Sequence, residues 1–158
     1  MTSQLIEFAG AVRASTVRRL LLVPPGAENW RIDPAAMSFA DMAQHLSDSD
    51  RWLHDALTAE VAEPMIGRAC VTHVADRAEF DALAKELRRG GEVRQELLAT
   101  LGPHGLSRQV RLSDLGEEVS AWWLTMRCGI EHEVHHRGQL VAYLRAWQYV
   151  GYDRSSSM

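Results

Sequence analysis

The chain has 158 residues, 24% of them charged, and a formal net charge of −4 at pH 7. This length suits one domain with its own hydrophobic core, and the negative balance argues against the basic surface with which proteins bind nucleic acids. With only two cysteines, Cys70 and Cys128, and no apolar run long enough for a signal peptide or a membrane span, we expect a cytoplasmic protein that binds neither nucleic acid nor membrane.

The first half of the chain predicts two helices. Apolar residues recur at helical spacing over residues 3–23, and Pro24-Pro25-Gly26 then interrupts the backbone hydrogen bonds. Ser38 followed three residues later by Asp41 resembles an N-terminal cap, in which the serine hydroxyl accepts a hydrogen bond from an exposed backbone N–H group. We therefore expect a second helix from Ser38 to about Leu57.

The middle of the chain predicts a long connection, a third helix and a pair of extended segments. The periodicity lapses over residues 58–75 and resumes over residues 76–101, with a kink or break expected at Gly90-Gly91. Residues 109–112 alternate polar and apolar side chains, which is typical of a short strand, and we expect them to pair with residues 117–119.

The fourth and longest predicted helix covers residues 120–151, and residues 152–158 are expected to form a disordered tail. Four helices with a short first connection and a long second one favour an all-α fold, a four-helix bundle with a crossover between the second and third helices. Residues 1–151 are thus expected to form a single domain.

Two histidines on the fourth helix have the spacing of metal ligands. His132 and His136 lie four residues apart, so their imidazoles point the same way from successive turns. A buried imidazole pair needs hydrogen bonds or a metal ion to satisfy it. At about 100° per residue, one narrow sector of this helix carries Thr125, Cys128, His132, His136, Gln139 and Tyr143.

A catalytic metal site usually has three protein ligands and an open position, so a third ligand is needed. Four histidines are poorer candidates because they lie in predicted connections, on another helix face or too far along the second helix: His54, His73, His104 and His135. His45 lies on the capped second helix among apolar residues, and bundles build metal sites from facing helices. We therefore predict that His45 completes the site with His132 and His136.

The same stretch fits a second motif, H-E-x-x-H, through His132, Glu133 and His136. A zinc peptidase of this type uses the glutamate as a base and normally takes its third ligand from downstream. Here the downstream ligand position holds Ala142, and neither His nor Glu follows His136. The peptidase hypothesis is therefore the weakest of those considered.

Two stretches together resemble a known family. Residues 38–46 read Ser-Phe-Ala-Asp-Met-Ala-Gln-His-Leu, and residues 132–140 read His-Glu-Val-His-His-Arg-Gly-Gln-Leu. They resemble the DinB/YfiT-like metalloenzymes, whose hallmark is one histidine on the second helix and H-x-x-x-H-R-G-Q on the fourth. The resemblance extends from the first helix to Arg145, and it implies an up-down-down-up bundle, a divalent metal held by three histidines, and a homodimer.

By this resemblance the metal ligands are His45, His132 and His136, and the relatives include thiol-dependent transferases. It implies a metal-dependent S-transferase or hydrolase acting on a small molecule, with Zn²⁺ or Ni²⁺ and a low-molecular-weight thiol as cosubstrate. The alternative is a non-catalytic, metal-binding stress-response protein. Gln139, Cys128 and Tyr143 are candidates for contact with the site, although packing in the core is the commoner role of a buried thiol or an inward aromatic ring.

Overall fold

The computed structural model describes residues 2–64, 71–114 and 116–155. Its elements, in chain order, are α1 (Thr2–Leu20), α2 (Phe39–Thr58), β1 (Val61–Ala62), α3 (Arg77–Ser107), β2 (Gln109–Leu112), β3 (Glu118–Ser120), α4 (Ala121–Leu124), the π-helix η1 (Thr125–Glu131) and α5 (His132–Ser155). The predicted all-α four-helix bundle is confirmed, with a small sheet in addition.

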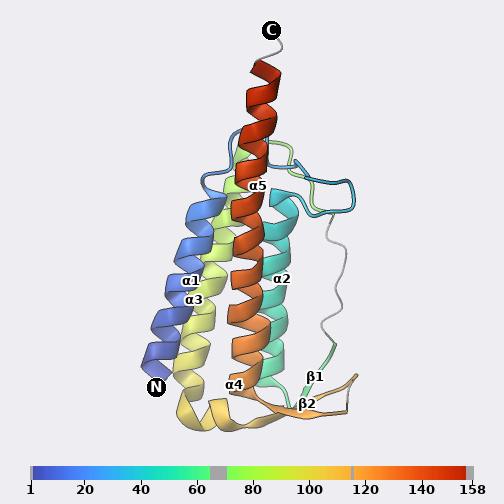
Figure 1. Ribbon diagram of the computed structural model, residues 1–158. Helices are drawn as coiled ribbons and strands as arrows, with labels where there is room; N and C mark the ends of the chain where they lie inside the picture. The colour runs from blue at the N-terminus through green and yellow to red at the C-terminus, as the bar shows by residue number, and fades with distance from the viewer. Residues whose placement is uncertain (1, 65–70, 115, 156–158) are drawn as a thin grey trace.

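The helices α1, α2, α3 and α5 lie side by side as one bundle (Figure 1). In that view α1 and α5 run upward, whereas α2 and α3 both run downward, which is the up-down-down-up order. The link between α2 and α3 includes residues 65–70, which lie outside the described part of the chain.

A three-stranded sheet lies at the lower end of the bundle in Figure 1. Its β2 and β3 are antiparallel, with Val110 opposite Val119, as the alternating pattern predicted. Its third strand, β1, pairs parallel to β2 through Val61 and Arg111. The strand β1 was not predicted, because two residues are too few to show the period of a strand.

The helix starts follow the predicted caps. At the start of α2, the Ser38 hydroxyl accepts from the Asp41 N–H, and the Asp41 carboxylate accepts from the Ser38 N–H, so the capping box is complete. Asp76 caps α3 by accepting from the N–H of Glu79. These local bonds define where α2 begins and hence which of its residues face the other helices.

The kink predicted at Gly90-Gly91 is wrong. The helix α3 runs through both glycines, and its non-helical residue is Gly102, with φ 58° and ψ −168°, immediately before Pro103. A Cβ atom on Gly91 would lie 2.5 Å from Cγ of Arg13. The close approach of α1 and α3 therefore requires a residue without a side chain at position 91. The contact between the two helices offsets the low helix propensity of glycine.

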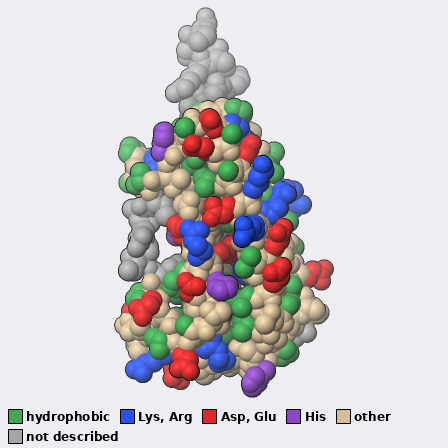
Figure 2. Space-filling model, turned by 180° about the vertical axis from the view of Figure 1, so that it is seen from behind, with side chains coloured by type: hydrophobic (Ala, Val, Ile, Leu, Met, Phe, Trp, Pro, Cys, Tyr) green, Lys and Arg blue, Asp and Glu red, His purple; other side chains and the backbone are tan. Residues whose placement is uncertain are grey.

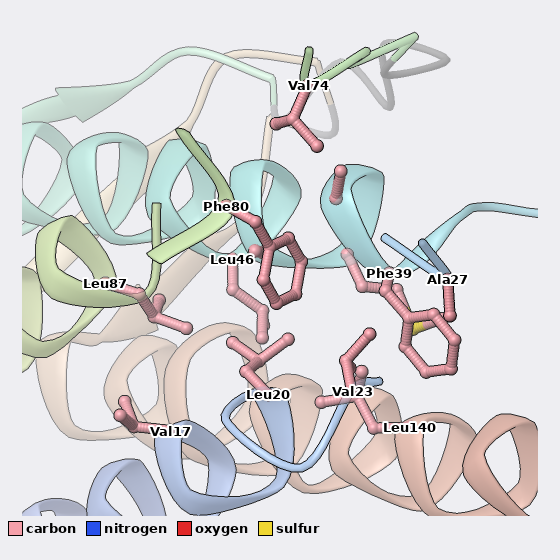
Figure 3. Close-up of a cluster of buried hydrophobic side chains, with 13 residues drawn as sticks. Val17, Leu20, Val23, Ala27, Phe39, Leu46, Val74, Phe80, Leu87 and Leu140 are labelled. Carbon is pink, nitrogen blue, oxygen red and sulfur yellow. The ribbon is translucent and has the colours of Figure 1, made fainter. Parts of the chain in front are cut away.

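The upper core joins all four long helices. Figure 3 shows Val17 and Leu20 of α1 with Phe39 and Leu46 of α2, Phe80 and Leu87 of α3, and Leu140 of α5. Trp30, from the loop after α1, packs on this cluster, with ring centroids 6.2 Å from Phe39 and 5.9 Å from Tyr143. Burying each large apolar side chain contributes about 1.5–3 kcal/mol, so these contacts hold α2 against α5.

The last helix continues to Ser155, beyond the boundary predicted at Gly151, and residues 156–158 lie outside the described residues. Residues 152–155 of the predicted tail are therefore helical. Of the helices described, none has the length and apolar character needed to cross a membrane.

Candidate metal centre

The bundle brings His45 of α2 together with His132 and His136 of α5. Nε2 of His45 lies 3.0 Å from Nε2 of His132, which in turn lies 2.9 Å from Nε2 of His136. The ring centroids are 4.6–4.9 Å apart, and the possible ligand atoms all lie within 4.8 Å of one another. Three imidazole nitrogens thus converge on one point between two helices.

All three histidines favour the neutral form that binds metals. Burial, together with the charges of neighbouring histidines, lowers the pKa of His132 and of His136 to about 4. Burial also lowers the pKa of His45, against a weaker opposing effect of Asp48. Near pH 7 each imidazole therefore has one ring nitrogen with a free lone pair, as metal coordination requires.

A bound divalent cation would satisfy this arrangement better than hydrogen bonds do. His132 Nε2 faces two other Nε2 atoms, and a single proton on it can serve only one of them. Its other nitrogen, Nδ1, is buried and has no hydrogen-bond partner among the described residues. With a proton on Nδ1, the Nε2 lone pair of His132 is left facing the two other rings. The donor set therefore fits a metal ion bound by three imidazoles.

Gln139 orients one of the three rings. Its Oε1 lies 2.7 Å from Nδ1 of His136 and accepts the proton carried there. The Nε2 lone pair of His136 is thereby directed toward the other histidines. Hydrogen bonds of this kind from the distal ring nitrogen commonly orient metal ligands. Of the three side chains considered for contact with the site, Gln139 is the one whose bond to a histidine the structure records.

Cys128 and Tyr143 lie in the core clusters. Cys128 packs on the lower cluster, which includes Leu53 and Leu124, and burial raises the pKa of its thiol despite the nearby charge of Arg127. Tyr143 packs on the upper cluster, 5.9 Å from Phe39 between ring centroids. Both side chains thus have the core roles that were the alternatives to contact with the site.

The predicted single sector of the last helix is interrupted by η1. Residues 125–131 form a π-helix, in which the i→i+5 hydrogen bonds change the angle per residue from its α-helical value. The rotation of about 100° per residue assumed for an α-helix therefore does not hold between Cys128 and His132, so the two side chains cannot be assigned to one sector on that basis. A Cβ atom on Gly129 would lie 2.8 Å from Cδ2 of Leu53, so η1 lies close against α2 just before the first ligand candidate of α5. The periodicity of the sequence does not reveal this segment, although Gly129 inside a long helical pattern is a signal of close packing.

Glu133 belongs to a buried network of four charges. It is 1% exposed and accepts from Arg13 at 2.8 Å and 3.0 Å and from Arg94 at 2.8 Å. Asp50 binds the same two arginines, at 2.6 Å and 3.1 Å. Burial alone would raise the pKa of Glu133, but the hydrogen bonds and charges of the two arginines outweigh it and lower the pKa to about 2.

This network removes Glu133 from the role that the peptidase hypothesis requires. A carboxylate bound by two guanidinium groups, with so low a pKa, is a poor base for activating water. The network could not be predicted from the sequence, because Arg13 lies 120 residues before Glu133 and no local pattern relates the two residues. The one available signal was an arginine at the apolar face of a helix, Arg13 beside Val12 and Val17.

Comparison with known proteins supports the fold. No protein-family model matches the chain, and no curated protein matches it either. The chain is similar to the structure of a DinB-like protein, YjoA, from Bacillus subtilis, with 20% identity, a TM-score of 0.71 and 92% of each chain covered. It is also similar to YfiT from Bacillus subtilis, described as a probable metal-dependent hydrolase with an unusual four-helix bundle topology. In that case the identity is 18% and the TM-score 0.73, with 93% of this chain and 87% of YfiT covered. The chain therefore has the fold of the DinB/YfiT-like proteins, as residues 38–46 and 132–140 implied.

Proposed function

We propose that this protein is a metal-dependent enzyme, a hydrolase or thiol-dependent S-transferase, that acts on a small molecule. The observation that carries the proposal is the convergence of three neutral imidazole nitrogens from His45, His132 and His136. A set of three protein ligands is typical of catalytic zinc sites, which keep a further position open. The similarity in fold to YfiT, described as a probable metal-dependent hydrolase, agrees with this assignment.

The residues of the chain have separate tasks in this proposal. A divalent ion such as Zn²⁺ or Ni²⁺, held by the three histidines, supplies Lewis acidity that lowers the pKa of water or of a small thiol. Gln139 holds the His136 ring in the orientation and tautomer for binding. Glu133 contributes no proton transfer, because Arg13 and Arg94 bind its carboxylate. It instead holds the first turn of α5, and hence His132, against α1 and α3.

Metal analysis tests the ligand assignment. The purified protein, reconstituted with Zn²⁺ or Ni²⁺ and freed of excess ion, should hold one ion per chain. His45→Ala and His132→Ala should lose it. His54→Ala, on the helix of His45, is a matched control whose side chain lies outside the cluster and should leave the stoichiometry unchanged. A parent protein that binds no divalent ion under these conditions would refute the assignment.

A spectroscopic experiment separates catalysis from a purely structural or sensory role. In Co²⁺-substituted protein, a thiol or azide added to an open position should change the visible absorption spectrum. The same protein should turn over activated esters, or a thiol with an electrophile, and His45→Ala should abolish that turnover. A spectrum insensitive to every added ligand would favour the non-catalytic metal-binding alternative.

A further inference from the structure

The histidine cluster lies where small molecules can reach it. The side chain of His136 is buried, whereas His45 and His132 are part-exposed, so solvent has access to the site between α2 and α5. Among the residues that the structure describes, no cysteine, aspartate or glutamate joins the three histidines as a further ligand candidate. The positions that the histidines leave open on a bound ion are therefore available to a substrate, and their number depends on the angles between the histidines.

Two distances between ligand nitrogens match ligands at right angles. At metal–nitrogen distances of about 2.0–2.1 Å, two ligand nitrogens lie about 3.3–3.4 Å apart in a tetrahedral site and about 2.8–3.0 Å apart when they meet the ion at 90°. Nε2 of His132 lies 3.0 Å from Nε2 of His45 and 2.9 Å from Nε2 of His136. Both distances agree with the right angles of an octahedral site.

The positions of the rings extend this agreement to the third pair. The centre of an imidazole lies about 1.15 Å beyond its ligand nitrogen, so two ring centroids are about 5.2 Å apart in a tetrahedral site and about 4.5 Å apart at right angles. The centroids of His45 and His136 are 4.7 Å apart, and those of His132 and His136 are 4.6 Å apart. The centroids of His45 and His132, at 4.9 Å, lie between the two values, but the Nε2 atoms of that pair are only 3.0 Å apart. The three imidazoles thus take the three adjacent positions on one face of an octahedron.

This arrangement decides how many donor atoms a substrate can bring to the ion. A tetrahedral site with three protein ligands has one open position, and one donor atom fills it. An octahedral site with three ligands on one face has three open positions, each next to the other two. A molecule with two suitably spaced donors can fill two of them, and its second donor binds without a further loss of translational freedom. The site is therefore suited to a chelating substrate.

The charge of the site favours a chelating molecule that is an anion. Three neutral imidazoles leave both positive charges of a divalent ion uncompensated. The carboxylates of Glu133 and Asp50 act on His132, but Arg13 and Arg94 already bind both of them. Figure 2, the view opposite to that of Figure 1, shows acidic and basic side chains interspersed rather than gathered into one basic patch. That face therefore offers no broad basic surface to compete with the metal centre for an anion.

We propose that the metal centre binds small carboxylates as chelates, through one carboxylate oxygen and a second oxygen, nitrogen or sulfur donor on the adjacent carbon atom. This inference rests on the proposed function and names the substrate class of the same site. It follows from the right angles among His45, His132 and His136, which leave adjacent positions open for the two donors.

Equilibrium dialysis with two isomeric ligands tests the chelate. Pyridine-2-carboxylate and pyridine-3-carboxylate have the same size and charge, but only the 2-isomer can bind one ion through both its nitrogen and its carboxylate. Protein loaded with one Ni²⁺ per chain should bind one 2-isomer per chain at least tenfold more tightly than the 3-isomer, and it should retain the ion. Equal affinities for the two isomers, or removal of the ion by the 2-isomer without a ternary complex, would overturn the proposal.

A spectrum and two variants complete the test. Protein loaded with Co²⁺ should absorb weakly in the visible range, as six-coordinate Co²⁺ does, and the intense absorption of four-coordinate Co²⁺ would overturn the octahedral arrangement. His54→Ala, outside the cluster, should bind the 2-isomer as the parent does, whereas His45→Ala should not bind it. The opposite result in either variant would place the ligand elsewhere and overturn the proposal. A parent protein that holds no ion would refute the ligand assignment itself, an outcome distinct from an ion that is held without a chelate.

Discussion

Nε of Arg13 donates a hydrogen bond of 2.8 Å to Oε1 of Glu133, joining the first helix to the last within the core. Glu133 directly follows His132 in the chain, so this bond fixes the backbone that carries a metal-ligand candidate. Arg94 reaches the same carboxylate from α3, and Asp50 reaches both arginines from α2. One buried ionic network thus ties together all four long helices beside the histidine cluster.

Replacing Glu133 by Gln should destabilise the fold by about 3–5 kcal/mol, because two buried arginines lose a shared counter-charge. Urea unfolding, followed by circular dichroism in the presence of a chelator, measures this cost. Glu131→Gln is the matched control: Glu131 is exposed, and its ion pair with Arg127 is exposed as well, so its loss should cost about 0–1 kcal/mol. Similar costs in the two variants would show that the buried network contributes little to stability.

Removing the amide of Gln139 should weaken metal binding more than it weakens folding. In Gln139→Leu the Nδ1 proton of His136 loses its acceptor, so the ring is no longer held in the binding tautomer. Loss of such a partner typically reduces metal affinity by about 10–100-fold. Competition with a chromophoric chelator measures the affinity, and Gln148→Leu, at an exposed position of the same helix, serves as control. An unchanged affinity in Gln139→Leu would contradict the orienting role.

Two glycine-to-alanine substitutions should change the free energy of unfolding in opposite directions. In Gly91→Ala the new Cβ would lie 2.5 Å from Cγ of Arg13, so the helices must shift, at a cost of about 1–3 kcal/mol. In Gly138→Ala the new Cβ meets nothing within 4 Å, and the helix gains roughly 0.5–1 kcal/mol of propensity. Thermal unfolding of both variants compares the two effects. A neutral Gly91→Ala would show that α1 and α3 are not held as close as the structure has them.

The thiol of Cys128 should be unreactive near neutral pH. Burial raises its pKa, so below its ordinary value near 9.0 the thiol stays protonated, and the reactive thiolate appears at higher pH than in a free cysteine. In Cys70→Ser protein, alkylation by iodoacetamide at pH 8 should be much slower than alkylation of the same protein in urea. Equal rates in the two conditions would mean that the thiol is accessible and ionised in the folded state.

Local spacing determined much of this protein from sequence alone. Apolar periodicity gave the four helices, and the Ser38 and Asp76 caps gave the starts of two of them, because these signals act within one or two turns. The pairing of β2 with β3 followed from their alternation across a short turn. The relation of His132 to His136 is also local, because four residues make about one helical turn.

Tertiary structure alone decided which distant groups meet. His45 reaches His132 only because α2 packs against α5. The sequence identified His45 as a candidate ligand, but it could not predict that its Nε2 lies 3.0 Å from Nε2 of His132. The contact of Gly91 with Arg13, the π-helix before His132 and the Arg13–Glu133 bond all depend on helix approach distances. Such distances follow from the packing of whole side chains in three dimensions, which no spacing along the chain encodes. The histidine pair could therefore be recognised in the sequence, whereas the ionic network that supports it could be recognised only in the fold.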